Sequence, residues 1–173
     1  MNNTLLVIDM LNDFIDKKGS LYVKNSENIV PIINTVIEDL SSKGLVIFAN
    51  DCHSKNDVEF EIYPKHCVKG TWGADIYPEI KIPKMCLRAT KTTFSALSNV
   101  ELLYVLKHMR IQTLYICGVV TEVCVYHTAI DAVKSQFDTV VIRNAICPLD
   151  EINGNQHIEH MINQGVGFSD NVH

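Results

Sequence analysis

One segment of the sequence concentrates side chains that bind metals. Within DCHSKNDVEFEIYPKH, which covers residues 51–66, four potential ligands occur: Asp51, His53, Glu59 and His66. Carboxylate oxygens and imidazole nitrogens are donors that zinc, iron and manganese accept. The competing interpretation is a loop of ordinary polar surface residues. Spacing leaves the choice of the acidic ligand open among Glu59, Asp57 and Glu61.

A second segment, CGVVTEVCVYHTAIDAV, contains the most informative thiol. It follows an apolar run, and Thr121 is placed to cap a helix whose first turn holds Cys124. Amide groups and the positive end of a helix stabilise a thiolate, so we expect a lowered pKa and a nucleophilic sulfur. The alternative is a small buried hydrophobic residue. We expect His127, one turn further along, to serve packing in the core or in a dimer.

A nucleophilic thiol needs groups that handle its proton. Asp9 ends an apolar run, where burial raises the pKa of a carboxyl and suits it to general acid and base catalysis. Lys91 could balance the charge of that carboxylate and stabilise a thiolate. The structural alternatives are a capping role for Asp9 and a solvated position for Lys91.

The elements that position these residues follow from hydrophobic patterning. Residues 4–10 (TLLVIDM) and 45–49 (LVIFA) are near-continuous apolar runs, typical of strands covered on both faces. Between them, apolar residues from Ile29 to Leu40 repeat with helical spacing, with Ser26 as the expected N-cap and Gly44 as the stop. This β-α-β unit predicts a parallel sheet.

The alternation continues after a long irregular stretch. Further strands are expected at 85–89, 113–117, 139–142 and near 166, and helices around 102–106, 123–133 and 155–164. We therefore predict one domain, residues 1–173, with a doubly wound, mainly parallel α/β sheet of about six strands and helices on both faces. A metal-binding loop is expected at about 50–84. Ligands of such sheets bind at the carboxyl ends of the strands, where these polar residues gather.

Composition excludes several classes of protein. The chain has 173 residues, 47% hydrophobic and 20% charged, with a formal net charge of -5 and no long block of one sign. This argues against nucleic-acid partners and favours small molecules. No apolar stretch is long enough for a membrane span or resembles a signal peptide, so we expect a cytoplasmic protein. Six cysteines without a C-x-x-C pair predict mostly free thiols.

Taken together, five stretches resemble the isochorismatase-like cysteine hydrolase superfamily, most closely its nicotinamidase branch. In chain order they are LLVIDMLNDF (5–14), DCH (51–53), PKHCVKGTWGAD (64–75), KTTFSAL (91–97) and GVVTEVCVYHTA (118–129). They span about 125 residues in the order that the superfamily has them. Each stretch alone is a weak signal, but the ordered set is specific.

The resemblance implies a role for each matching residue. It implies a catalytic triad of Asp9, Lys91 and Cys124 and a metal site of Asp51, His53 and His66, with Glu59 aligned best as a fourth ligand. It also implies an oxyanion hole from the backbone N-H groups of Val120 and Cys124. Aromatic rings that hold the substrate are implied at Phe14 and Tyr63, and a cis peptide between Val119 and Val120.

The implied activity is metal-assisted hydrolysis of nicotinamide to nicotinate and ammonia through a thioester, which feeds NAD salvage. The cofactor is one divalent ion, zinc as the first expectation and iron or manganese as alternatives. The resemblance also implies a homo-oligomer. Two other functions remain open: hydrolysis of another small amide or carbamoyl compound, and a non-enzymatic thiol and metal binding protein that uses the same loop for storage or sensing.

Overall fold

The computed structural model describes residues 3–172 and contains a single six-stranded sheet in which every neighbouring pair of strands is parallel. The order β3-β2-β1-β4-β5-β6 reverses direction between β1 and β4. This confirms the predicted doubly wound sheet. The strands are β1 Asn3–Ile8, β2 Leu45–Asp51, β3 Leu87–Lys91, β4 Thr113–Val119, β5 Asp138–Cys147 and β6 Gly167–Ser169.

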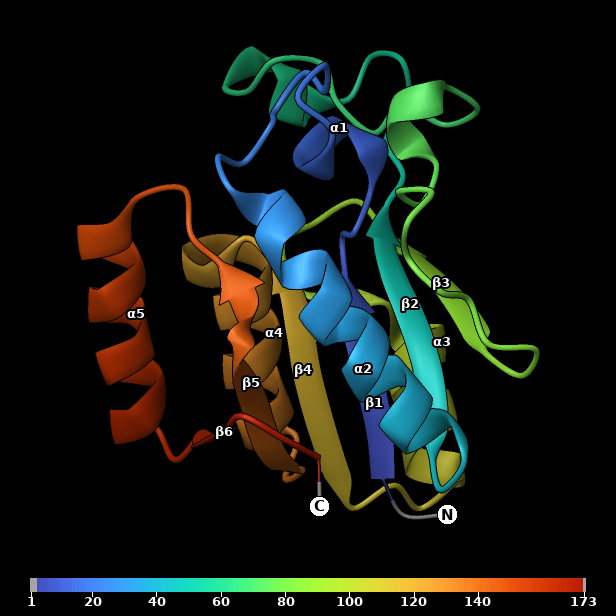
Figure 1. Cartoon of the computed structure of the whole chain (residues 1–173), viewed down its shortest axis with the longest axis vertical. Coiled ribbons are helices and arrows are strands. Elements are labelled where there is room, and N and C mark those ends of the chain that lie inside the picture. Colours follow the sequence, from blue (N-terminus) through green and yellow to red (C-terminus); the bar gives the residue numbers. More distant parts are fainter. Residues whose placement is uncertain (1–2, 173) are drawn as a thin grey trace.

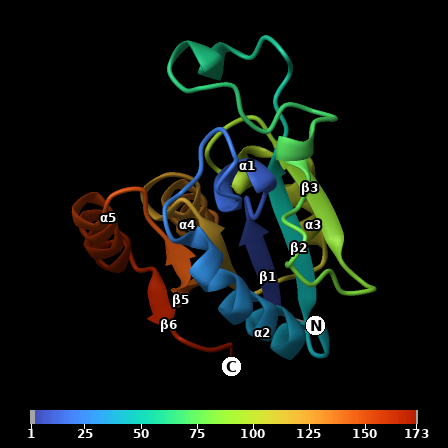
Figure 2. The same ribbon diagram turned by 45° about the horizontal axis from the view of Figure 1, so that its top comes forward.

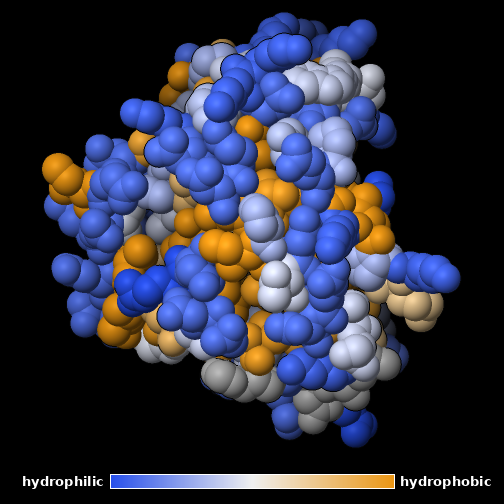
Figure 3. Space-filling model, in the orientation of Figure 1, coloured by the Kyte–Doolittle hydropathy of each residue, from blue (hydrophilic) through white to orange (hydrophobic). Residues whose placement is uncertain are grey.

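Helices lie on both faces of the sheet (Figure 1). Side chains of α2 pack against one face, and side chains of α3, α4 and α5 contribute to the core on the other. On the side that α2 covers, hydrophilic side chains surround smaller hydrophobic patches (Figure 3). The helices are α1 Asn12–Ile15, α2 Val30–Ser41, α3 Val100–His108, α4 Tyr126–Lys134 and α5 Glu151–Asn163.

The two-sided packing explains the apolar runs in the sequence. In β1, Leu5 and Val7 are buried in the core beneath α2, whereas Leu6 and Ile8 are buried in the core beneath α3 and α4. Successive side chains of a strand point to opposite faces, so a central strand of this sheet requires apolar residues at nearly every position. Asp9, directly after β1, is where this pattern breaks.

Two predicted helix starts are wrong in detail. Residues Ser26–Ile29 form a 3₁₀ turn and α2 begins at Val30. The Ser26 hydroxyl donates instead to the carbonyl of Phe14 at 3.1 Å. Likewise, Thr121–Val125 forms a π-helical turn before α4, and Thr121 makes no capping hydrogen bond. Tertiary contacts outweighed the local capping preference at the first site.

The long connection between β2 and β3 is irregular, as predicted. Its helical parts are single 3₁₀ turns at Val58–Glu61 and Trp72–Ala74. An isolated bridge between Leu11 and Ile76 attaches the loop to the segment after β1, and a second bridge, between His53 and Val68, lies within the loop. Figure 2 shows the loop rising above the carboxyl ends of the strands. Across residues 3–172, no helix combines the length and apolar character needed to cross a membrane.

Gly118 allows β4 to approach β1 at the edge where the polar residues gather. Its φ is 115°, and an added Cβ would lie 2.0 Å from the carbonyl oxygen of Ile8. We predict that Gly118→Ala lowers the free energy of unfolding by about 3 kcal/mol, because strain and overlap add. Gly70→Ala is the matched control: its φ is 79°, but no atom lies within 4 Å of the added Cβ. It should cost about 1 kcal/mol. Equal losses in denaturant unfolding would contradict a role for the overlap.

Candidate active site

Three charged side chains meet at the carboxyl ends of adjacent strands. Asp9 follows β1, while Asp51 and Lys91 are the last residues of β2 and β3 and are paired in register. Asp9 has a φ of 51°, a left-handed conformation that residues other than glycine seldom adopt. Its carboxylate accepts a hydrogen bond from the backbone N-H of Asp51 at 2.7 Å. This hydrogen bond links the end of β1 directly to the end of β2.

The ammonium of Lys91 is the centre of this group. Its Nζ lies 2.7 Å from Oδ2 of Asp9 and 2.5 Å from Oδ1 of Asp51. The same Nζ lies 3.4 Å from Sγ of Cys124. All four side chains are buried. The structure thus brings together the acid, the amine and the thiol that the resemblance implied.

Burial and neighbouring charges shift the ionisation of the group. Burial, with the Asp51 carboxylate in addition, raises the pKa of Asp9 to about 6, as the sequence predicted. Burial acts to lower the pKa of Lys91, but the adjacent carboxylates outweigh it and hold that pKa well above its ordinary value. A charged amine and a carboxyl that titrates near neutrality therefore sit side by side.

The environment of Cys124 differs from the sequence expectation. Burial raises the pKa of its thiol well above the ordinary value; the Lys91 charge acts to lower this pKa, and the carboxylates of Asp9 and Asp51 act to raise it. The predicted lowering of the pKa is wrong, because the thiol is buried and two carboxylates lie near it. The peptide bond between Val119 and Val120 is cis. The carbonyl of Val120 accepts hydrogen bonds from the N-H groups of Val123 and Val125, both at 3.1 Å, which closes the turn.

A cluster of carboxylates and imidazoles adjoins the buried lysine. Donor atoms of Asp51, His53 and His66 lie within 4.8 Å of one another, and all three residues are buried. His53 Nε2 is 3.8 Å from Asp51 Oδ2 and 4.0 Å from Glu59 Oε2. His66 Nε2 is 3.7 Å from Glu59 Oε1. Because Oδ1 of Asp51 faces Lys91 and Oδ2 faces His53, this residue belongs to both groups.

The donor set fits a divalent cation. Ligands about 2.1 Å from a tetrahedral ion lie about 3.4 Å apart, so small shifts would bring these atoms around one ion. Among residues 3–172, the buried Nε2 of His53 has no hydrogen-bond partner. The Asp51 carboxylate, 3.8 Å from Nε2, and further acidic neighbours raise the pKa of His53 to about 9, despite burial. A field that favours a proton so strongly also favours a metal cation.

The geometry distinguishes the three acidic candidates that spacing left open. Glu59 faces Nε2 of both histidines, whereas Asp57 approaches Nδ1 of His53 at 3.1 Å, and Glu61 is exposed. Nδ1 of His66 lies 2.8 Å from the carbonyl of Pro64 and donates to it, so Nε2 is the ring nitrogen that faces Glu59. The arrangement places Glu59 at the cluster and Asp57 behind it.

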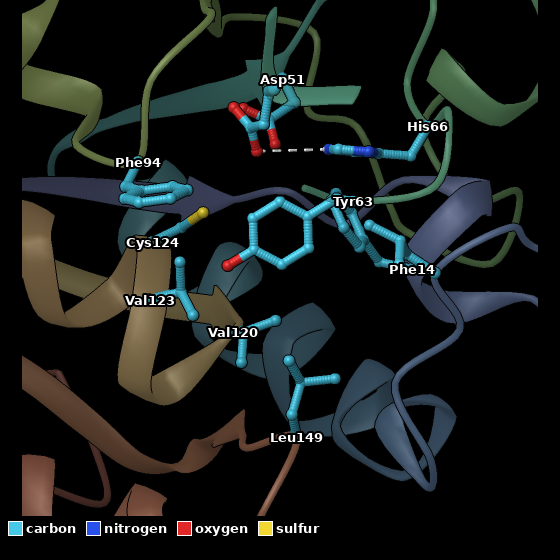
Figure 4. Close-up of a pocket in the computed structure, with 11 residues that line it drawn as sticks. Phe14, Asp51, Tyr63, His66, Phe94, Val120, Val123, Cys124 and Leu149 are labelled. Carbon is cyan, nitrogen blue, oxygen red and sulfur yellow. Dashed lines mark ion pairs between the residues drawn. The ribbon is translucent and has the colours of Figure 1, made fainter. Parts of the chain in front are cut away.

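A pocket of about 450 Å³, including its open mouth, joins the thiol to this cluster. The Cys124 sulfur and the rings of Phe94, Tyr63 and Phe14 all point into it (Figure 4). The sequence indicated Phe14 and Tyr63 but not the remaining apolar wall. The pocket is lined by Phe14, Leu21, Asp51, Glu59, Tyr63, His66, Phe94, Val120, Val123, Cys124 and Leu149.

Phe94 and Leu149, which the sequence did not indicate, are held in the pocket wall by contacts with His127 and Glu122. Phe94 stacks on His127 with ring centroids 5.4 Å apart; His127 is exposed and is not a core residue. The buried Glu122 accepts hydrogen bonds from the N-H groups of Leu149 and Asp150, both at 3.0 Å. It thereby ties the turn of Cys124 to the wall at Leu149. A carboxylate two residues before the thiol was the only sequence signal for this link.

Comparison with known proteins identifies relatives over nearly the whole chain. The chain is 29% identical to a nicotinamidase of Acinetobacter baylyi over 95% of this chain and 91% of that protein. It is 32% identical to a probable inactive nicotinamidase of Arabidopsis thaliana, over 82% and 78%. The crystal structure of a Pyrococcus horikoshii pyrazinamidase in complex with zinc superposes with a TM-score of 0.92 at 29% identity, covering 98% of this chain and 99% of that one. The isochorismatase domain model matches residues 3–171. The chain belongs to the isochorismatase family.

Proposed function

We propose that this protein is a metal-assisted cysteine amidohydrolase that converts nicotinamide to nicotinate and ammonia. The observation that carries the proposal is the meeting of Cys124, Asp9 and Lys91 beside the carboxylate and histidine cluster, at one pocket. Relatives named nicotinamidase and pyrazinamidase support this choice of substrate. The product makes NAD salvage the pathway that the enzyme serves.

In the proposed mechanism, Asp9 removes the proton of the neutral Cys124 thiol as the sulfur attacks the amide carbonyl. A carboxyl with a pKa of about 6 accepts and returns protons near neutral pH, and the fixed charge of Lys91 stabilises the anion that develops. Backbone N-H groups of Val120 and Cys124 stabilise the oxyanion. The C-N bond then breaks, and Asp9 delivers the proton to the departing ammonia.

The acyl group is left on Cys124 as a thioester. Water, deprotonated by Asp9, attacks the thioester carbonyl, and cleavage of the C-S bond releases the carboxylic acid and returns the proton to the thiol. One carboxyl thus acts as base in each half of the reaction and as acid in the collapse that follows. The burial that keeps Asp9 at an intermediate pKa also makes this exchange of roles possible.

The substrate ring is assigned to the apolar part of the pocket. Phe14 and Tyr63 would contact the ring, and Asp51, His53, His66 and Glu59 would hold the ion. When bound, the ion would act as a Lewis acid toward the pyridine nitrogen and so orient the ring. Zinc is the proposed metal, and iron or manganese would accept the same donors. The metal in the Pyrococcus horikoshii structure supports this assignment.

The first experiment tests the activity itself, because one relative is named as a probable inactive enzyme. Ammonia release should be measured with nicotinamide, other primary amides and carbamoyl compounds. We expect hydrolysis of nicotinamide that falls after chelation and returns after addition of zinc. If only carbamoyl compounds were hydrolysed, the enzyme class would stand and nicotinamide would be the wrong substrate.

The nucleophile is tested by Cys124→Ala. We predict a fall in kcat of about 10⁴-fold or more, because no other thiol takes the place of the attacking atom. Zinc content should remain that of the wild type. Cys86→Ala, which removes a half-buried thiol that does not line this pocket, is the control and should remain active. Turnover by the Cys124 variant would refute the thioester mechanism.

The metal site is tested by His53→Ala. Loss of one buried imidazole should lower the zinc bound per chain and raise KM for nicotinamide by about tenfold or more, because the ring loses its anchor. His108→Ala, at the exposed end of α3, is the control. The ratio of metal to protein can be measured by elemental analysis. An unchanged ratio would remove His53 from the site.

A further inference from the structure

The two histidines of the cluster share one backbone unit, the residue Cys67. It follows His66 directly, and its carbonyl accepts a hydrogen bond from the N-H of His53 at 3.0 Å. Cys67 has a φ of 45°, which is costly for a residue with a side chain. A change in this conformation would move both imidazoles at once. Something outside the loop must therefore hold Cys67 in place.

Asp13 of α1 provides that hold. Its side chain is buried, and Oδ2 accepts a hydrogen bond from the N-H of Cys67 at 2.7 Å, while Oδ1 accepts one from the N-H of Ser20 at 3.1 Å. Gly73 leaves the space that the carboxylate occupies, since a Cβ there would lie 2.0 Å from Oδ2. Both oxygens are used by different backbone donors. Among side chains of this size, the carboxylate is the one that offers two acceptor oxygens.

We propose that Asp13 is a positioning residue that sets the affinity of the His53 and His66 pair for its divalent ion. It acts through the N-H of Cys67 and touches neither the substrate nor the metal ligands' donor atoms. The inference rests on the proposed metal site. Groups that orient the ligands of a metal typically contribute 10- to 100-fold to its affinity.

The experiment replaces one oxygen of Asp13. In Asp13→Asn, one of the two oxygens that face these N-H donors becomes an NH2 group, which cannot accept, so either Cys67 or Ser20 loses its partner. The dissociation constant of zinc should be measured by chelator competition on metal-stripped protein. We expect zinc to bind at least tenfold more weakly. At saturating zinc, kcat should return to within threefold of the wild type, which a general loss of structure would not allow.

Asp16→Asn is the matched control. It makes the same substitution at the end of the same helix, where the carboxylate accepts the N-H of Lys18, and it should leave zinc affinity unchanged. Gly73→Ala is a second variant for the case in which Asp13→Asn does not fold. The added Cβ would overlap the Asp13 carboxylate and displace it without removing it, so this variant should also bind zinc more weakly.

The outcomes distinguish the positioning role of Asp13 from the existence of the metal site. Wild-type zinc affinity in both Asp13→Asn and Gly73→Ala would overturn the positioning role and leave the proposed metal site intact. Absence of stoichiometric zinc binding by the wild-type chain would overturn the metal site itself, and this inference with it. Weak binding in both variants with normal binding in Asp16→Asn supports the role.

Discussion

The rest of the site depends on one buried ion pair network, the ammonium of Lys91 between the carboxylates of Asp9 and Asp51. Removing three charges from water is expensive, and close contacts at 2.7 and 2.5 Å are what offset the cost. These contacts exist only because the ends of β1, β2 and β3 are adjacent and the last residues of β2 and β3 are in register. The catalytic geometry is therefore also a constraint on the sheet.

The same network connects ionisation to metal binding. One oxygen of Asp51 faces Lys91 and the other faces His53, so the charge of the amine and the charge of the cluster act on a single carboxylate. Burial acts to raise the pKa of Asp51, but Lys91 and His53 outweigh it and keep that pKa low. Asp51 stays ionised, while Asp9, which lacks the second cationic neighbour, titrates at about 6. Two carboxylates 42 positions apart in sequence thus share one lysine but acquire different properties from burial and from their other neighbours.

Carboxylates that organise backbone form a second layer around this centre. Asp13 binds the N-H of Cys67 between the two histidines, and Glu122 binds the N-H groups of Leu149 and Asp150 at the opposite wall of the pocket. Both are buried side chains that accept from backbone donors of distant segments. Such hydrogen bonds to ionised groups are stronger than neutral ones, which suits them to holding irregular loops. Buried carboxylates therefore hold the backbone in place on both sides of the pocket.

The sequence by itself determined the alternation of strands and helices, the parallel sheet and the gathering of Asp9, Asp51 and Lys91 at one edge, because apolar periodicity and chain order are local signals. Only the tertiary structure decided that the Cys124 thiol has a raised pKa, that Glu59 and not Asp57 faces both imidazoles, and that Phe94 and Leu149 line the pocket. The tertiary structure also decided that α2 begins after Ser26 and not at it. Each of these depends on burial or on contacts between segments far apart in the chain, and such contacts leave no periodic pattern in the sequence.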